Sequence, residues 1–231
     1  MRTYLLLLIA AMLLTPGCGQ GSSGQVEGLP APPPGQPNQQ PAPPNLQGKH
    51  VLMIIAHQNF RDEELLKPRQ ILQNAGAEIT IASSSLAPAR GALGATVKPD
   101  LLLKDVNPAD YAAVVFVGGP GAKEYWQDQQ AHEIARLALD KDKPARPGIL
   151  AAICIAPVTL ANAGVLKGKR ATVWPSEAPR LKAAGAIYTA QHVETDGPII
   201  TADGPESAAQ FGQALLKALA DSRSPEVQSA K

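Results

Sequence analysis

The chain has 231 residues, with 21 lysines and arginines against 20 aspartates and glutamates and a formal net charge of +1. Without a basic stripe or an acidic run, this balance excludes nucleic acid as an expected partner and gives no sign of a charged interaction tail. The two cysteines are Cys18, which ends an export signal, and Cys154, which is left as an unpaired thiol. Such a thiol in an exported protein is either reactive or protected by burial.

Residues 1–17 are predicted to be a lipoprotein signal peptide. Arg2 supplies a positive start, and the apolar stretch from Tyr4 to Leu14 is shorter than the roughly 20 residues that span a bilayer. The segment Leu14-Thr-Pro-Gly-Cys18 resembles a bacterial lipobox, so Cys18 is the expected lipidation site. The chain should then be lipid-anchored in the bacterial cell envelope, on the periplasmic or extracellular side of a membrane. The alternative is an ordinary signal peptide that is cut nearby and leaves Cys18 free.

Three further parts follow along the chain. Residues 18–48 are rich in proline and glycine, with Glu27 as the only charge, and are predicted to form a disordered tether because they cannot bury enough apolar surface. Residues 49–222 form the expected single domain, which is long enough for one core. Residues 223–231 are a polar tail, predicted to be flexible.

Apolar runs alternate with helical patterns within this domain. Strands are predicted over residues 50–56, 77–83, 111–117, 149–153, 171–173, 192–195 and 199–202. Helices are predicted over residues 68–75, 130–140, 156–163 and 205–220, with Pro68 in a first turn and Gly76 and Gly164 as end signals. Continuous apolar strands separated by helices predict an α/β fold, doubly wound, with a mainly parallel sheet covered by helices on both faces in a flavodoxin-like sandwich.

Ligands bind such sheets at the carboxyl ends of strands, near a topological switch point. Three segments leave strand ends: residues 57–64, 118–126 and 154–157. The fold class therefore predicts that these segments meet at one site.

Cys154 falls where a buried strand turns abruptly into a helix. This placement resembles a nucleophile elbow with sulfur in place of a hydroxyl, and the helix N-terminus is expected to favour the thiolate. The alternative is a small buried cysteine that fills space between Ala152 and Ala156. Spacing alone does not separate the two.

The segment Phe60-Arg-Asp-Glu-Glu-Leu-Leu-Lys-Pro68 supplies acidic residues close to a helix start. Asp62 and Glu63 are expected only to complement the helix dipole. Glu64 precedes two leucines and is expected to point inward, where burial would keep its proton and let it donate a hydrogen bond to a neighbouring thiolate.

Several motifs resemble the ThiJ/PfpI family of the class I glutamine-amidotransferase-like superfamily. They are Ala151-Ala-Ile-Cys154 with Pro157, followed by Ala163-Gly-Val-Leu-Lys-Gly-Lys-Arg170, a glutamate four residues before Pro68, Val117-Gly-Gly119, and Thr201-Ala-Asp-Gly-Pro205. Together they cover essentially residues 49–220.

The resemblance implies that Cys154 is the reactive thiol and Glu64 its partner, and that the backbone amides of Gly119 and Ile155 receive an oxyanion. It also implies a homodimer and a small carbonyl compound as substrate. The pocket is predicted to be lined by Gly118, Pro120, His57 and Trp174. For His57, a solvated loop position is the alternative.

Departures from the family pattern narrow the chemistry. Ile155 stands where many members carry histidine, which argues against Cys-His peptidase chemistry, and Asp203 replaces an arginine that helps to bind anions. The four histidines show no metal-ligand spacing, the glycines after Val117 fit neither a dinucleotide fingerprint nor a P-loop, and no metal or cofactor is predicted. His132 is expected on a helix surface.

Three hypotheses follow. The protein is a cysteine-dependent deglycase- or glyoxalase-like enzyme acting on small carbonyl compounds or glycated adducts, a redox-sensing or protective protein through oxidation of Cys154, or a non-catalytic binding module that keeps the fold.

Overall fold

The computed structural model describes residues 44–140 and 148–222. The chain divides into two units, Met1–Pro41 and Ala42–Lys231, and all described residues belong to the second. The predicted signal peptide, Cys18, most of the predicted tether and the predicted tail at 223–231 therefore lie outside the described residues. Within the described ranges, no helix combines the length and hydropathy needed to cross a membrane.

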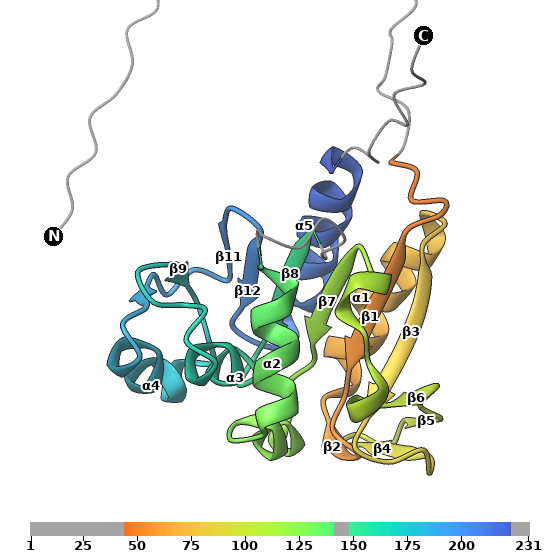
Figure 1. Ribbon diagram of the computed structural model, residues 1–231, viewed down its shortest axis with the longest axis horizontal. Coiled ribbons are helices and arrows are strands. Elements are labelled where there is room, and N and C mark those ends of the chain that lie inside the picture. Colours follow the sequence, from red (N-terminus) through yellow and green to blue (C-terminus); the bar gives the residue numbers. More distant parts are fainter. Residues whose placement is uncertain (1–43, 141–147, 223–231) are drawn as a thin grey trace, which may run out of the picture. The chain divides into compact units, whose positions relative to one another are not determined.

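The centre of the second unit is a seven-stranded sheet (Figure 1). The strand order is β11-β12-β8-β7-β1-β3-β6, and every neighbouring pair is parallel except the antiparallel pair β11–β12. The strands are β1 (His50–Ile54), β3 (Glu78–Ser83), β6 (Leu101–Leu102), β7 (Ala113–Phe116), β8 (Ile149–Ile153), β11 (Val193–Asp196) and β12 (Ile199–Ala202). β7 and β8 are buried along their whole length, as expected of strands covered on both faces.

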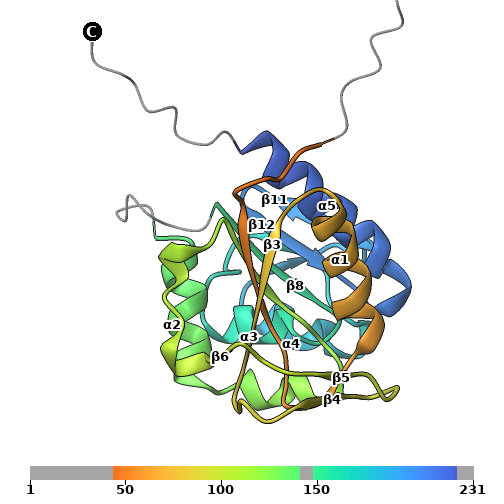
Figure 2. The same ribbon diagram turned by 90° about the vertical axis from the view of Figure 1, so that its right-hand side faces the viewer.

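Helices cover both faces of this sheet (Figure 2). α1 (Asp62–Asn74) and α5 (Ala208–Asp221) pack together on one face, and α2 (Gln129–Ala138) lies on the other with α3 (Pro157–Asn162) beside it. α4 (Ala178–Ala183) packs on α3. The predicted doubly wound, mainly parallel α/β fold is confirmed.

Several short elements were not predicted. β2 (Gln58–Phe60), β4 (Ala89–Gly91) and β5 (Thr96–Val97) form a three-stranded sheet, and β10 (Ile187–Tyr188) pairs with β9 (Arg170–Ala171), which overlaps the strand predicted over residues 171–173. The described residues also contain five 3-10 turns: Leu103–Asp105, Pro108–Asp110, Pro120–Tyr125, Pro175–Glu177 and Pro205–Ser207. Strands of two or three residues carry too few side chains for an alternating pattern to be detected.

The first helix begins at Asp62 rather than at Pro68, so the predicted start is wrong. The buried Asp62 carboxylate accepts hydrogen bonds from the backbone N–H groups of Leu93 (2.9 Å) and Ala95 (2.7 Å), which fixes the first turn against the β4–β5 hairpin. Pro68 lies inside the helix and cannot donate to the carbonyl four residues before it. It is buried where α1 approaches Gly212 of α5 closely, so tertiary packing offsets the lost bond.

The packed unit also begins before Lys49, where the tether was expected to end. Leu46 is fully buried in the core, and its backbone N–H donates to the carbonyl of Ala75 at 2.7 Å. The last residues of the predicted tether are therefore part of the domain, because a single leucine in a polar stretch supplies enough apolar surface to anchor it.

Candidate active site

The switch point of the sheet lies at β1, which pairs with β3 on one side and β7 on the other. The chain leaves the carboxyl ends of β1, β7 and β8 into the segments that carry Glu64, Gly119 and Cys154. These three residues line one cavity, so the three predicted segments do meet there.

Cys154 forms a strained turn between β8 and α3. Its φ is 63°, in the left-handed region that residues with a side chain rarely occupy. Its N–H donates to the carbonyl of Ala202 at 2.9 Å, and its carbonyl accepts from the N–H of Trp174 at 2.8 Å. The sulfur is thereby turned toward the cavity, although the residue is only 8% exposed.

Glu64 lies in the first turn of α1, fully buried. Neither carboxyl oxygen has a hydrogen-bond partner of good geometry among the described residues, although the Cys154 thiol and the Gly118 amide are close enough to lower its pKa. Burial outweighs them and raises the pKa of Glu64 to about 8. The carboxyl is therefore mostly protonated at neutral pH, as the sequence predicted for an inward-facing glutamate.

The pKa of the Cys154 thiol differs from the value expected for a thiol at a helix N-terminus. Burial, followed by the charge of Glu64, raises its pKa to about 12, whereas the expectation was a lowered value. α3 has only six residues, and its N-terminus cannot compensate for desolvation. Because the effect of Glu64 requires an ionised carboxylate, the two groups titrate as a pair, and the first proton lost belongs to both.

Two backbone amides face the sulfur. Hydrogen bonds from Gly119 and Ile155 oppose the rise in the pKa of Cys154, which places both N–H groups on the side where negative charge would develop. Gly119 has a φ of 97°, and a Cβ there would stand 2.3 Å from the backbone nitrogen of Arg61. A Cβ on Gly118 would stand 2.5 Å from Glu64 Oε2 and 2.6 Å from Cys154 Cβ. Only glycines allow this approach.

The cavity has a volume of about 310 Å³. It is lined by Arg61, Glu64, Gly119, Pro120, Lys123, Cys154, Ile155, Trp174, Ser176, Glu177 and Pro205. Pro120 and Trp174 are among the lining residues, as predicted. Gly118 was also predicted to line the pocket but does not, because it stands behind the lining, between Glu64 and Cys154.

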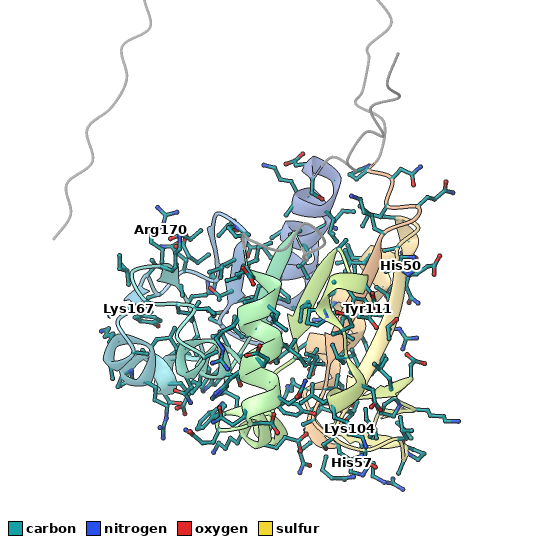
Figure 3. The ribbon with its side chains drawn as sticks, in the orientation of Figure 1. His50, His57, Lys104, Tyr111, Lys167 and Arg170 are labelled. Carbon is teal, nitrogen blue, oxygen red and sulfur yellow. The ribbon has the colours of Figure 1, made fainter. Side chains whose placement is uncertain are left out.

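His57 does not line this cavity, contrary to the prediction. It lies on the loop after β1, at the lower edge of the view in Figure 3. Its backbone N–H donates to Glu124 Oε1 at 3.3 Å, which turns the loop toward the 3-10 turn after β7 instead of the thiol. Among the described residues, no histidine lines the cavity.

Sequence patterns missed the charged lining residues. Arg61 is held by Glu63 through two contacts, Nε to Oε2 at 2.8 Å and a terminal nitrogen to Oε1 at 3.1 Å. Glu177 accepts from Arg180 Nε at 2.8 Å. Lys123, on the 3-10 turn after Gly119, is exposed. Charged residues in loops are usually solvated, and nothing in their spacing distinguishes these from ordinary surface groups.

Trp126 connects the end of the 3-10 turn Pro120–Tyr125 to the turn that carries Cys154. Its indole N–H donates to the carbonyl of Ile155 at 3.1 Å, and its own carbonyl accepts from Asn162 Nδ2 at 2.7 Å. His132 Nε2 lies 3.0 Å from the same carbonyl, so this nitrogen carries the hydrogen. His132 is buried, contrary to its expected place on a helix surface, because this contact turns it inward.

Asp203 does not line the cavity. Its carboxylate contacts His192 Nδ1 at 2.8 Å and accepts a hydrogen bond from the hydroxyl of Ser207, so its position is used to hold the start of α5. Within residues 44–140 and 148–222, no group of three or more histidine, cysteine, aspartate or glutamate residues is arranged to hold a metal ion.

The geometry of the site indicates a class of protein. A thiol on a strained strand-to-helix turn, at the switch point of a parallel sheet and beside a buried carboxyl, is the arrangement of an α/β protein with a cysteine nucleophile elbow. The solved ThiJ/PfpI domain protein from Brachyspira murdochii matches with a TM-score of 0.71 and 33% identity, over 77% of this chain and 100% of that one.

Sequence comparisons agree with this class. The chain is 42% identical over 178 residues to an uncharacterised protein of Methanocaldococcus jannaschii, across 76% of this chain and 84% of that protein. It is 30% identical over 168 residues to a deglycase of Pyrococcus abyssi, across 73% and 98%. The model of the DJ-1/PfpI family matches residues 49–218. The chain belongs to the DJ-1/PfpI family.

Proposed function

We propose that this protein is a cysteine-dependent enzyme of the deglycase or glyoxalase kind, acting on small carbonyl compounds or glycated adducts. The observation that carries the proposal is the placement of Cys154 in a cavity beside the buried carboxyl of Glu64 and the amides of Gly119 and Ile155. The name of the Pyrococcus abyssi relative, a deglycase, supports the same chemistry.

The first step is addition of sulfur to the carbonyl carbon. The reacting form is the fraction of molecules in which Glu64 is ionised. In that form Cys154 Sγ forms the new C–S bond, its proton passes to the Glu64 carboxylate, and the carbonyl oxygen becomes an oxyanion that the amides of Gly119 and Ile155 bind. Glu64 then returns the proton to that oxygen, which gives a neutral hemithioacetal. A carboxyl with a raised pKa can take and give this proton near neutral pH.

A 2-oxoaldehyde can continue without an external oxidant. Glu64 removes the proton from the sulfur-bearing carbon and delivers it to the adjacent carbonyl carbon. The hydroxyl proton of the hemithioacetal moves at the same time to the oxygen of that second carbon, so the hemithioacetal becomes the thioester of a 2-hydroxy acid through an enediol. Water then cleaves the C–S bond, releases the 2-hydroxy acid and restores the thiol. The sum is one 2-oxoaldehyde and one water to one 2-hydroxy acid, with no change of overall oxidation state.

The site supports the alternatives less well. Peptidase chemistry needs a histidine near the thiol, and none of the described residues lining the cavity is a histidine. Redox sensing needs a standing thiolate, whereas burial raises the pKa of Cys154. The enzyme does not need a standing thiolate, because Glu64 can take the thiol proton as the sulfur attacks. A non-catalytic module would show no cysteine-dependent turnover.

The test is consumption of methylglyoxal and formation of lactate by the purified protein, measured against Cys154→Ser and Glu64→Gln. We expect no turnover with Cys154→Ser and a loss of at least about 100-fold with Glu64→Gln. Alkylation of Cys154 by iodoacetamide at pH 9, where Glu64 is ionised, should instead become faster in Glu64→Gln, because the negative charge that adds to the effect of burial on the thiol pKa is gone. Equal turnover in wild type and Cys154→Ser, or none in the wild type with methylglyoxal or a glycated amino acid, would reject the enzyme.

We also propose that the protein acts in a bacterial envelope. The lipobox-like segment ending at Cys18 supports a lipid-anchored protein of a bacterial envelope, and the family resemblance supports a homodimer with the membrane contacted only through the anchor. Metabolic labelling with a fatty acid should tag the wild type and not Cys18→Ala. Light scattering of the released domain measures its oligomeric state.

A further inference from the structure

The charges around the cavity are almost completely paired. The guanidinium of Arg61 is held by Glu63, and the carboxylate of Glu177 is held by Arg180. Glu64 keeps its proton below a pH of about 8. Each of these lining groups therefore contributes little net charge at neutral pH.

Lys123 is the exception among the described lining residues. It makes no salt bridge within the described part of the chain, and its ammonium lies 5.6 Å from the centroid of the Trp126 ring. The ammonium group of a lysine is a compact point charge, and Lys123 is exposed. One positive charge at the cavity therefore has no carboxylate partner among the described residues. An anionic group that enters the cavity would supply that partner.

The rest of the lining is mostly apolar. Pro120, Ile155, Trp174 and Pro205 form its walls, and the Trp174 ring sits against Gly204, where a Cβ would come within 2.8 Å of it. These surfaces suit a short methylene chain. Among the described lining residues, the cavity thus combines a thiol and two amides for an electrophilic carbonyl, an apolar wall, and one cation without a carboxylate partner.

We propose that Lys123 is a specificity-determining residue that selects electrophiles carrying a carboxylate, and that the substrates are 2-oxoaldehydes with a carboxylate on a short aliphatic chain. The assignment of substrate rests on the proposed function. The charge selectivity at Cys154 does not, because it follows from the cavity alone and can be measured without turnover.

Two alkylating reagents of nearly equal size measure this selectivity. Iodoacetate is an anion and iodoacetamide is neutral, and with either one the sulfur of Cys154 forms the C–S bond, iodide leaves, and the thiol proton goes to solvent. The rates are measured at one pH on the full chain by mass spectrometry of the peptide that contains Cys154. The ratio of the two rates cancels any change in thiol pKa.

Lys123→Gln should lower the iodoacetate-to-iodoacetamide ratio about fivefold, and Lys123→Glu should lower it further, since the effect is a screened charge interaction. The wild-type ratio should also fall at 0.5 M NaCl. Lys217→Gln is the matched control: Lys217 lines a hollow with Gly148 and Ile149, at the opposite end of β8 from Cys154. A ratio that is the same in wild type and Lys123→Gln overturns the proposal.

The substrate is tested with 4,5-dioxopentanoate and its neutral methyl ester, which differ in the carboxylate alone. The wild type should convert the acid to 2-hydroxyglutarate with at least fivefold higher kcat/KM, and Lys123→Gln should bring the two values within about twofold. Equal values in the wild type overturn the substrate assignment. If neither compound is turned over but methylglyoxal is, the substrate assignment fails and the proposed function stands. If methylglyoxal and a glycated amino acid are not turned over either while the alkylation ratio still falls, the proposed function fails and the anion selectivity of Lys123 stands.

Discussion

Replacing Glu64 by glutamine should change how the stability of the domain depends on pH. The pKa of this carboxyl rises from 4.5 to about 8 on folding, chiefly through burial. The folded state therefore holds more protons than the unfolded chain between these values, and the stability contributed by neutral Glu64 is complete below pH 4.5 and is lost as pH rises toward 8. Glutamine has no proton to lose.

The magnitude follows from the size of the shift. At 1.36 kcal/mol per pKa unit, the difference between 4.5 and about 8 corresponds to about 5 kcal/mol of unfolding free energy. Glutamine still leaves a buried polar group without a partner, so its cost is constant with pH. The wild type should lose several kcal/mol relative to Glu64→Gln between pH 4.5 and pH 8.5.

Urea unfolding at a series of pH values between 4.5 and 8.5 measures this difference. The upper limit keeps Cys154 out of the comparison, because the ordinary pKa of its thiol is 9.0 and burial raises that pKa to about 12 in the fold. Glu63→Gln is the control, since the pKa of Glu63 is lowered and its contribution is lost only as pH falls. Parallel stability curves for wild type and Glu64→Gln would refute the assignment of a raised pKa to Glu64.

Three further predictions concern the site and the core. Trp126→Phe removes the side-chain hydrogen bond to the carbonyl of Ile155 and should lower kcat about tenfold with KM within twofold; a change in KM alone would mean that the indole acts in binding. Gly118→Ala should reduce turnover at least tenfold, because its Cβ would collide with Glu64 and Cys154. Gly148→Ala should leave turnover unchanged, because a Cβ there would lie 3.6 Å from its nearest neighbour, the carbonyl oxygen of Ala112. Leu46→Ala should cost about 2–5 kcal/mol in urea unfolding against less than about 0.5 kcal/mol for the exposed Leu93→Ala, and equal losses would argue against Leu46 as a core residue.

The large elements of the fold could be predicted because their signals are local. Residues 149–153 and 199–202 are continuous apolar runs of strand length, and the structure has β8 and β12 over those residues. The start of α1 could not be predicted, because Pro68 is a strong start signal and the packing against Gly212 that tolerates it is a long-range contact. Strand order is likewise set by contacts between distant segments.

The site also has features that the sequence could predict and features that it could not. The segments of Cys154, Glu64 and Gly119 could be brought together from the rule for strand ends. The pKa of Cys154 could not be predicted from the sequence. It depends on how deeply the sulfur is buried and on a neighbouring carboxyl, and the spacing of residues along the chain gives neither. The sequence carries no signal that places Lys123 and Arg61 at the site, and only the structure shows that Arg61 is paired with Glu63 while Lys123 has no carboxylate partner among the described residues.

The left-handed backbone at position 154 sets the stability of the fold against the presence of a nucleophile. Glycine reaches a φ of 63° without steric penalty, so Cys154→Gly should relieve about 1–2 kcal/mol of backbone strain while removing the nucleophile. Selection for thermal stability alone would therefore favour glycine at this position. That cysteine occupies it is what a chain selected for the reactivity of its sulfur would be expected to show.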